Sequence, residues 1–186
     1  EACRQAQAWR DLGLPEIKMS VNLAGQQLMH QRVIDMVASA LRASGLPATC
    51  LELEVTESYL IRQTELIVPK IEKMKAMGVG FSMDDFGTGY SSFSYLKALP
   101  VDRLKIDKSF VQDLDSNRGD KSIILAILAL CKGLELDVVA EGVDSQAQKD
   151  FLIEHGCTTI QGYLYSKPLD ADETQQFLQE RAHTAI

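Results

Sequence analysis

The sequence has no paired cysteine motif and no long hydrophobic run. Its four cysteines, Cys3, Cys50, Cys131 and Cys157, form no Cys-x-x-Cys pair and have no histidines at a metal-binding spacing. We therefore expect reduced thiols in the core of a cytoplasmic protein rather than disulfides or a zinc site. The longest apolar stretch, 123–131, is far shorter than the roughly 20 residues that span a bilayer. No signal peptide is recognisable, which also favours the cytoplasm, and a parent protein with a membrane anchor elsewhere is compatible with this expectation.

Basic residues are too few for a protein that binds nucleic acid through its surface charge. The sequence has 19 Lys and Arg against 26 Asp and Glu, a net charge of −7. Broad binding to duplex nucleic acid needs a basic face, so we exclude it. An acidic protein can still bind a phosphate ligand when metal cations lie between its carboxylates and the phosphates.

The sequence also lacks low-complexity segments, internal linkers and repeats, so its organisation shows in its strand and helix patterns. Six short β-branched or apolar runs end on polar residues of the types that bind metals or phosphates. These are Asn22, Glu54, the pair Asp84-Asp85, Lys105, Glu141 and Gln161. Helical patterns fill most of the gaps, which predicts a parallel sheet with its chemistry at the carboxyl ends of the strands.

The length limits how complete such a fold can be. A chain of 186 residues with 46% hydrophobic content can bury one sizeable core, and we expect a single domain over residues 1–186. A closed eight-stranded α/β barrel usually takes about 250 residues. Six strands therefore predict a TIM-like (β/α) barrel without its first strands.

Asp84 and Asp85 are the sharpest local signal in the chain. Neighbouring side chains on a strand point to opposite faces, so we expect this pair just past a strand end, where both carboxylates can serve one site. The following run, Phe86-Gly87-Thr88-Gly89-Tyr90-Ser91, adds flexible glycines and hydroxyl donors. This combination favours a loop that binds phosphate or metal over a solvated turn.

Two other motif matches in this region are rejected because the sequence around them lacks the rest of each motif. Asp85-Phe86-Gly87 spells the metal-binding triplet of protein kinases, but no HRD loop or VAIK strand lies upstream. The pair Gly87-x-Gly89 lacks the third glycine and the following acidic strand end of a dinucleotide site. A kinase and a dinucleotide-binding domain are both excluded.

The other strand-end residues differ in how strongly they point to a site. Lys105 lies between two apolar residues, and a lysine in a buried strand usually has acidic partners. Glu54 ends a strand, whereas we expect Glu57 on the following loop, where it can hold a neighbouring loop by accepting backbone N–H bonds. Asn22 and Gln161 are weak signals singly, and the argument depends on the whole set.

The residues described above lie in sequence stretches that resemble the EAL domain, the phosphodiesterase domain that degrades the bacterial second messenger cyclic di-GMP. The resemblance covers nearly the whole chain, with several motifs in order. The matching stretches are SVNLAGQQL, LELEVTES, DDFGTGYSSFSYLKALPVDRLKIDKSFV, VVAEGVDSQAQ and CTTIQGYLYSKPL.

The resemblance implies metal-dependent hydrolysis of cyclic di-GMP to linear pGpG. The implied ligands of one or two Mg²⁺ or Mn²⁺ ions are Asn22, Glu54, Asp84 and Asp85. The implied catalytic residues are Lys105, which would position the attacking water, Glu141, which would support the metal–water cluster, and Glu57, which would steady the Asp84-Asp85 loop. With the loop chemistry above, we predict substrate contacts from Asp85, Gly87, Thr88, Gly89 and Gln161.

Two departures from the family pattern qualify this prediction. The naming motif, Glu-Ala-Leu followed by an arginine, lies on an earlier strand and is not in this chain. Glu1-Ala2-Cys3 imitates it but opens a helix only 22 − 1 = 21 residues before Asn22. We expect the chain to be the C-terminal three-quarters of the domain and inactive by itself, without one metal ligand and a phosphate-binding arginine. The second departure, Ala24 and Asp144 in place of serine and glutamate, is mild.

Two alternatives and several partners remain open at this stage. The first alternative is a non-catalytic EAL-like receptor for cyclic di-GMP or a protein-interaction module, and the second is a different metal-dependent barrel acting on a carboxylate substrate. We expect a homodimer, because the helix over 121–134 is apolar nearly all round and the segment 91–99 carries Phe93 and Tyr95. The resemblance further implies fusion to sensor or GGDEF-type domains in the parent protein.

Overall fold

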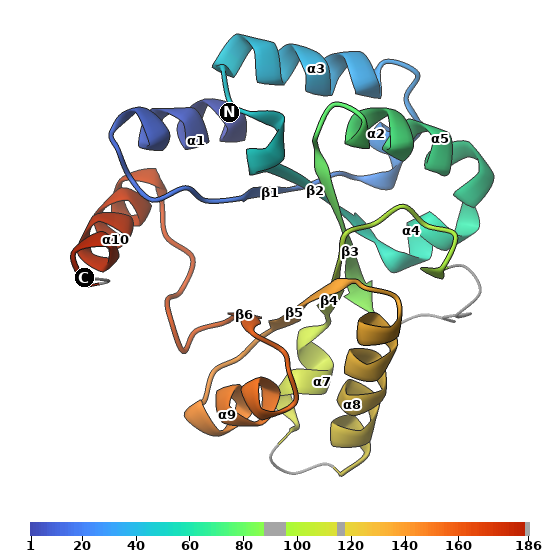
Figure 1. Cartoon of the computed structure of the whole chain (residues 1–186), viewed down its shortest axis with the longest axis vertical. Coiled ribbons are helices and arrows are strands. Elements are labelled where there is room, and N and C mark those ends of the chain that lie inside the picture. Colours follow the sequence, from blue (N-terminus) through green and yellow to red (C-terminus); the bar gives the residue numbers. More distant parts are fainter. Residues whose placement is uncertain (88–95, 115–117, 185–186) are drawn as a thin grey trace.

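Six parallel strands form one continuous sheet in the computed structural model, which describes residues 1–87, 96–114 and 118–184. The strands are β1 (Met19–Asn22), β2 (Leu51–Thr56), β3 (Gly80–Phe86), β4 (Arg103–Ile106), β5 (Asp137–Glu141) and β6 (Thr159–Gln161). Their order in the sheet is their order in the chain, and every neighbouring pair is parallel. Each predicted strand is present, and the sheet curls as an incomplete barrel (Figure 1), which confirms the predicted fold class.

Helices connect the strands and pack against the outside of the curl (Figure 1). They are α1 (Ala2–Asp11), α2 (Gly25–Met29), α3 (Val33–Ser44), the 3₁₀ turn η1 (Ala48–Cys50), α4 (Glu57–Arg62), α5 (Thr64–Lys75), α7 (Lys108–Gln112), α8 (Arg118–Gly133) and α9 (Gln146–Glu154). The last helix, α10 (Ala171–Thr184), lies instead beside the open side of the curl. Within the described ranges, no helix has both the length and the apolar composition that crossing a bilayer requires.

The two faces of the sheet differ in chemistry because side chains alternate along each strand. On the outer face, Phe81, Leu104 and Ile106 are fully buried against core-facing helix residues such as Ile71 and Ile124. The inner face carries the polar partners of this alternation, and several of them are also buried: Glu52, Glu54, Ser82 and Lys105. A barrel interior is usually filled by branched apolar residues. The side chains on this inner face are mainly polar, with Val139, the register partner of Lys105, as a buried apolar exception.

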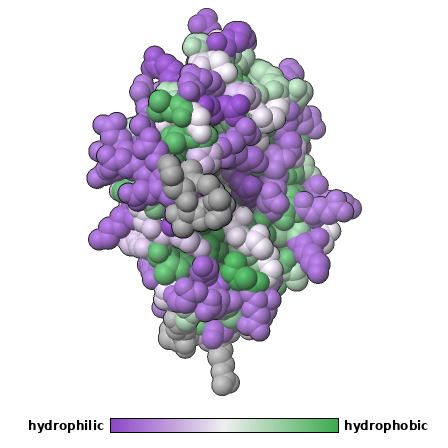
Figure 2. Space-filling view, turned by 60° about the vertical axis from the view of Figure 1, so that its left-hand side comes forward, coloured by the Kyte–Doolittle hydropathy of each residue, from purple (hydrophilic) through white to green (hydrophobic). Residues whose placement is uncertain are grey.

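The surface seen toward the open side is mainly hydrophilic, with apolar residues in separate patches (Figure 2). All four cysteines are free thiols and are buried, as expected for reduced residues in a core.

The predicted position of Asp84 and Asp85 was wrong. Both residues lie within β3, which continues to Phe86. The pairing of β3 with β4 shifts register between Met83 and Phe86, and Asp85 has a left-handed backbone with φ of 57°. A bulge of this kind re-aims the side chains that it contains. The irregularity therefore has the effect that the sequence analysis assigned to a strand end.

Candidate functional site

Strand pairing brings the predicted residues to one edge of the sheet. Asn22 of β1 is the register partner of Glu54 on β2, and Glu141 of β5 is the partner of Gln161 on β6. Asp84 is the register partner of Thr56, which lies two residues beyond Glu54 on β2. Since all six strands run the same way, these positions share the carboxyl edge, where parallel sheets hold their sites.

Lys105 lies at the centre of this group. Its Nζ is 2.7 Å from Glu54 Oε2, 2.7 Å from Glu141 Oε1 and 3.2 Å from Asp84 Oδ1. Lys105 is 5% exposed and Glu54 is 8% exposed. One buried ammonium thus joins carboxylates from β2, β3 and β5.

The electrostatics keep this lysine charged. Burial alone would lower the pKa of Lys105, but hydrogen bonds with Glu141 and Glu54 and the charges of Glu141 and Asp84 outweigh it, so the pKa lies above its ordinary value. Burial raises the pKa of Glu141, and the Lys105 ammonium offsets that rise only in part. The cluster holds more negative charge than the one ammonium neutralises.

Asp85 belongs to the same acidic region. Its pKa is raised by burial and by the charges of Asp84 and Asp107, and Lys105 offsets this in part. Asp107 caps α7 by accepting a hydrogen bond from Ser109 N at 2.9 Å. The sequence analysis did not select Asp107, although it follows Lys105 by two residues, the spacing at which side chains share a face of a strand.

Glu57 is the first residue of α4 rather than a loop residue, which corrects the predicted placement. It is 1% exposed, and its Oε2 accepts a hydrogen bond from Gly87 N at 3.0 Å. A Cβ on Gly87, whose φ is 98°, would lie 2.7 Å from the Phe110 ring, so both the backbone angle and the space require glycine. The helix start and the end of β3 are held together at this point.

The remaining predicted residues are placed unevenly. Asn22 and Gln161 are at the carboxyl edge but exposed, on β1 and β6, the outermost strands of the sheet. Thr88 and Gly89 lie outside the described residues, as do Phe93 and Tyr95.

The donor set fits a hard divalent cation by its chemistry. Carboxylate and amide oxygens are the ligands that Mg²⁺ and Mn²⁺ take in proteins. In the described part of the chain, no three Asp, Glu, His or Cys side chains form a group ready to enclose a cation. Three carboxylates of this edge, Glu54, Asp84 and Glu141, instead contact the Lys105 ammonium.

Sequence analysis also missed a second buried ion pair on the inner face. Glu52 is 1% exposed and is bound by Arg103, whose Nη1 lies 3.1 Å from Oε1 and 3.0 Å from Oε2. Because side chains alternate along a strand, Glu52 and Glu54 lie on the same face of β2. The local sequence, however, does not indicate that Glu52 contacts Arg103, which is 51 residues away.

A family model described as the EAL domain matches residues 1–168. The chain belongs to the EAL domain family. Among curated relatives, the bifunctional diguanylate cyclase/cyclic di-GMP phosphodiesterase MucR of Pseudomonas aeruginosa is 44% identical over 173 residues. That match covers 93% of this chain and 25% of MucR, so the EAL-family chain spans about a quarter of the length of this relative.

Solved EAL domains have the same fold. The phosphodiesterase of MucR in complex with cyclic di-GMP superposes with a TM-score of 0.89, over 93% of this chain and 70% of that one, at 44% identity. The EAL domain of Mycobacterium smegmatis DcpA has a TM-score of 0.91 at 40% identity, over 96% and 81%. BlrP1 of Klebsiella pneumoniae, with manganese and cyclic di-GMP, has a TM-score of 0.80 at 29% identity, over 88% and 42%. Solved members of the family therefore include one that holds a divalent cation together with the cyclic dinucleotide.

Proposed function

We propose that this chain carries the metal-binding and catalytic residues of a cyclic di-GMP phosphodiesterase, which forms linear pGpG with Mg²⁺ or Mn²⁺. The observation that carries the proposal is the contact of Lys105 Nζ with Glu54, Asp84 and Glu141 at the carboxyl edge. A charged lysine inside an excess of carboxylates suits a reaction that brings water to an anionic phosphodiester. The relatives named above support the same substrate.

Each residue has a distinct part in this proposal. Asn22, Glu54, Asp84 and Asp85 would hold the cation, which when bound would polarise the phosphodiester and lower the pKa of a bound water. Lys105, charged at neutral pH, offers N–H donors that orient the attacking water and stabilise the developing negative charge. Glu141 holds the Lys105 ammonium in place. Glu57 holds the Gly87 backbone, and Asp85, Gly87, Thr88, Gly89 and Gln161 would contact the nucleotide.

A receptor that binds cyclic di-GMP without cleaving it is the second candidate. The position of Lys105 favours it, because the ammonium already neutralises part of the charge that a cation would neutralise. The two functions differ in product: only the enzyme forms pGpG.

The deciding experiment measures cyclic di-GMP binding and pGpG formation with Mg²⁺ and with Mn²⁺. It uses the 186-residue chain and a version extended upstream through a Glu-Ala-Leu strand. We expect metal-dependent pGpG formation by the extended version and its loss in Asp84→Asn. Binding with no product from either version would establish the receptor, and no binding by either would refute both functions.

We also propose the setting in which the domain works. A homodimer, cytoplasmic location and fusion to sensor or GGDEF-type domains fit the domain type. The name of MucR, which combines cyclase and phosphodiesterase activities, supports the fusion. Exposed Ile123 and Leu125 on α8 support the dimer.

A further inference from the structure

Two ion pairs, which we call rungs, cross the inner face of the sheet. The upper rung is nearer the carboxyl ends of the strands, and the lower rung is nearer their amino ends. In the upper rung, Lys105 of β4 contacts Glu54 of β2. In the lower rung, Arg103 of β4 contacts Glu52 of β2. Both rungs pass over β3, which lies between β2 and β4 in the sheet. The acids are two residues apart on one strand and the bases are two residues apart on the other.

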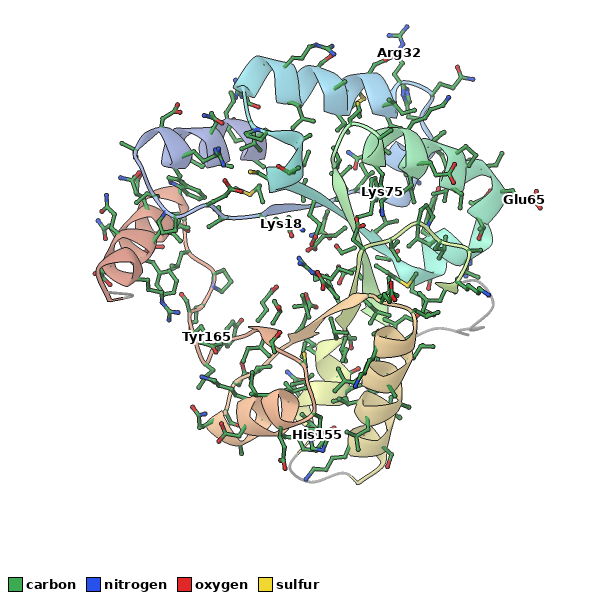
Figure 3. All side chains as sticks on the ribbon, in the orientation of Figure 1. Lys18, Arg32, Glu65, Lys75, His155 and Tyr165 are labelled. Atoms are coloured by element: carbon green, nitrogen blue, oxygen red, sulfur yellow. The ribbon has the colours of Figure 1, made fainter. Side chains whose placement is uncertain are left out.

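In the lower rung, both oxygens of Glu52 and both Nη atoms of Arg103 have polar partners, whereas Arg103 Nε is buried without one. Besides the two contacts with Arg103 Nη1, Glu52 has Lys18 Nζ 3.7 Å from Oε2 and accepts a hydrogen bond from Ser20 Oγ at 3.3 Å. Arg103 Nη2 also lies 3.3 Å from Asp137 Oδ2. Lys18 projects from the chain just before β1 toward the inside of the curl (Figure 3). A buried carboxylate with several cationic and hydroxyl partners holds a guanidinium firmly in one orientation.

Small residues on β3 leave the room for this contact. Gly80 is the register partner of Glu52, and Ser82 is the partner of Arg103. A Cβ on Gly80 would already be 3.6 Å from Glu52 Oε2, so a longer side chain would occupy the space through which the two charged groups meet. Ser82, fully buried between the rungs, has an Oγ with no hydrogen-bond partner.

We propose that Glu52 is a positioning residue that keeps Arg103 away from Glu54, so that Glu54 remains available to Lys105 and to the cation. Glu54 is the next carboxylate along the same face of β2, about 7 Å beyond Glu52. A guanidinium that lost its contact with Glu52 would turn to this carboxylate, because charge-assisted hydrogen bonds to carboxylates are its strong interactions. Arg103 would then compete with the cation for Glu54. The metal part of this inference rests on the proposed function.

The test compares Mn²⁺ affinity, by electron paramagnetic resonance titration of the free ion, in Glu52→Gln and in Glu52→Gln combined with Arg103→Met. The single change should weaken Mn²⁺ binding about tenfold or more, the usual effect of losing a group that orients a ligand. The double variant should return to within about threefold of the unchanged chain, because the competing guanidinium is gone. A double variant as weak as the single one would overturn the proposal, since Glu52 would then act only through packing.

Two matched controls separate positioning from stability. Asp102→Asn removes a partly buried partner of Lys75 away from the inner face, and Ser82→Ala removes a buried polar atom between the rungs. Both should keep the Mn²⁺ affinity even where they lower the melting temperature. A loss of affinity in Ser82→Ala as large as that in Glu52→Gln would contradict the specific role of Glu52.

A crystal structure of the Glu52→Gln chain gives an answer that does not depend on metal binding. Arg103 should contact Glu54, and an Arg103 that stays beside residue 52 would overturn the inference. If the unchanged chain takes up no Mn²⁺, the proposed metal site fails, and this structure alone decides the role of Glu52.

If the glutamine variant does not fold, Glu52→Asp replaces it. This variant should weaken Mn²⁺ binding about threefold or more, and unchanged binding would refute the proposal.

Discussion

Glu57 Oε2 accepts a hydrogen bond from Gly87 N at 3.0 Å, which joins the first residue of α4 to the residue after β3. The carboxylate is 1% exposed, so the bond forms where water does not compete. The two acidic residues of the β3 bulge, Asp84 and Asp85, lie three and two residues before Gly87, the residue that Glu57 holds. Glu57 therefore limits how far the bulge can move.

Glu57→Ala should lower the free energy of unfolding by about 1–3 kcal/mol, because a buried carboxylate is removed and the partly buried N–H of Gly87 loses its partner. Urea denaturation measures the change. Glu65→Ala is the control, since Glu65 is exposed on α5 and projects outward (Figure 3). A surface change of this type stays within about 0.5 kcal/mol. Equal losses in the two variants would show that the Glu57 contact contributes nothing.

Lys105→Ala should lower kcat by roughly 10²-fold or more in a version of the domain that turns over cyclic di-GMP, and leave substrate binding mostly intact. The reason is that the ammonium acts on the water and the developing charge rather than on the bound nucleotide. Lys75→Ala is the control, because Lys75 pairs with Asp102 outside the site. A loss of affinity with kcat unchanged would make Lys105 a phosphate anchor instead.

Gly162→Ala should destabilise the fold by about 3 kcal/mol or more. A Cβ on Gly162 would lie 2.1 Å from Val143 O, and this backbone cannot give way without disturbing the β5–β6 edge. Gly133→Ala is the matched change, since nothing lies within 4 Å of its Cβ position at the end of α8. It should raise stability by about 0.5–1 kcal/mol. Thermal melts of the two variants should therefore move in opposite directions.

Stability should fall at alkaline pH because of Cys131. Burial, with a contribution from Cys157, raises the pKa of Cys131 to about 11. The thiol of the unfolded chain ionises from about pH 9, so between about pH 9 and about pH 11 the unfolded state binds fewer protons and gains stability. Urea denaturation at both ends of this window should show a smaller pH-dependent loss in Cys131→Ala than in the unchanged chain. An identical loss in both would mean that other groups cause it.

The dimer proposal concerns α8, where Ile123 is 40% exposed and Leu125 is 38% exposed. Leu125→Glu should yield a monomer by light scattering, because burying a charge at an apolar interface is unfavourable. Met36→Glu is the control, since Met36 is 57% exposed on α3, away from α8. A chain that is monomeric at high concentration before any substitution would refute the dimer.

The strand pattern needed no tertiary information. Apolar runs ending at residues such as Glu54, Lys105 and Glu141 predicted the six strands and their shared edge, because the alternation of side chains and the direction of parallel strands are local rules. The same rule puts Glu52 and Glu54, which are two residues apart on β2, on one face of the sheet. Local chemistry also indicated that Lys105 would have acidic partners, and the motif order pointed to the family that the comparisons then established.

Which residues meet across the sheet was decided only by the tertiary structure. The β3 bulge that holds Asp84 and Asp85 arises from pairing with β4, and Glu57 became a helix start rather than a loop residue. The contact of Arg103 with Glu52 crosses an intervening strand and depends on the register of three strands and on small side chains between them. Register and curvature are properties of the assembled sheet, and no single segment of the chain encodes them.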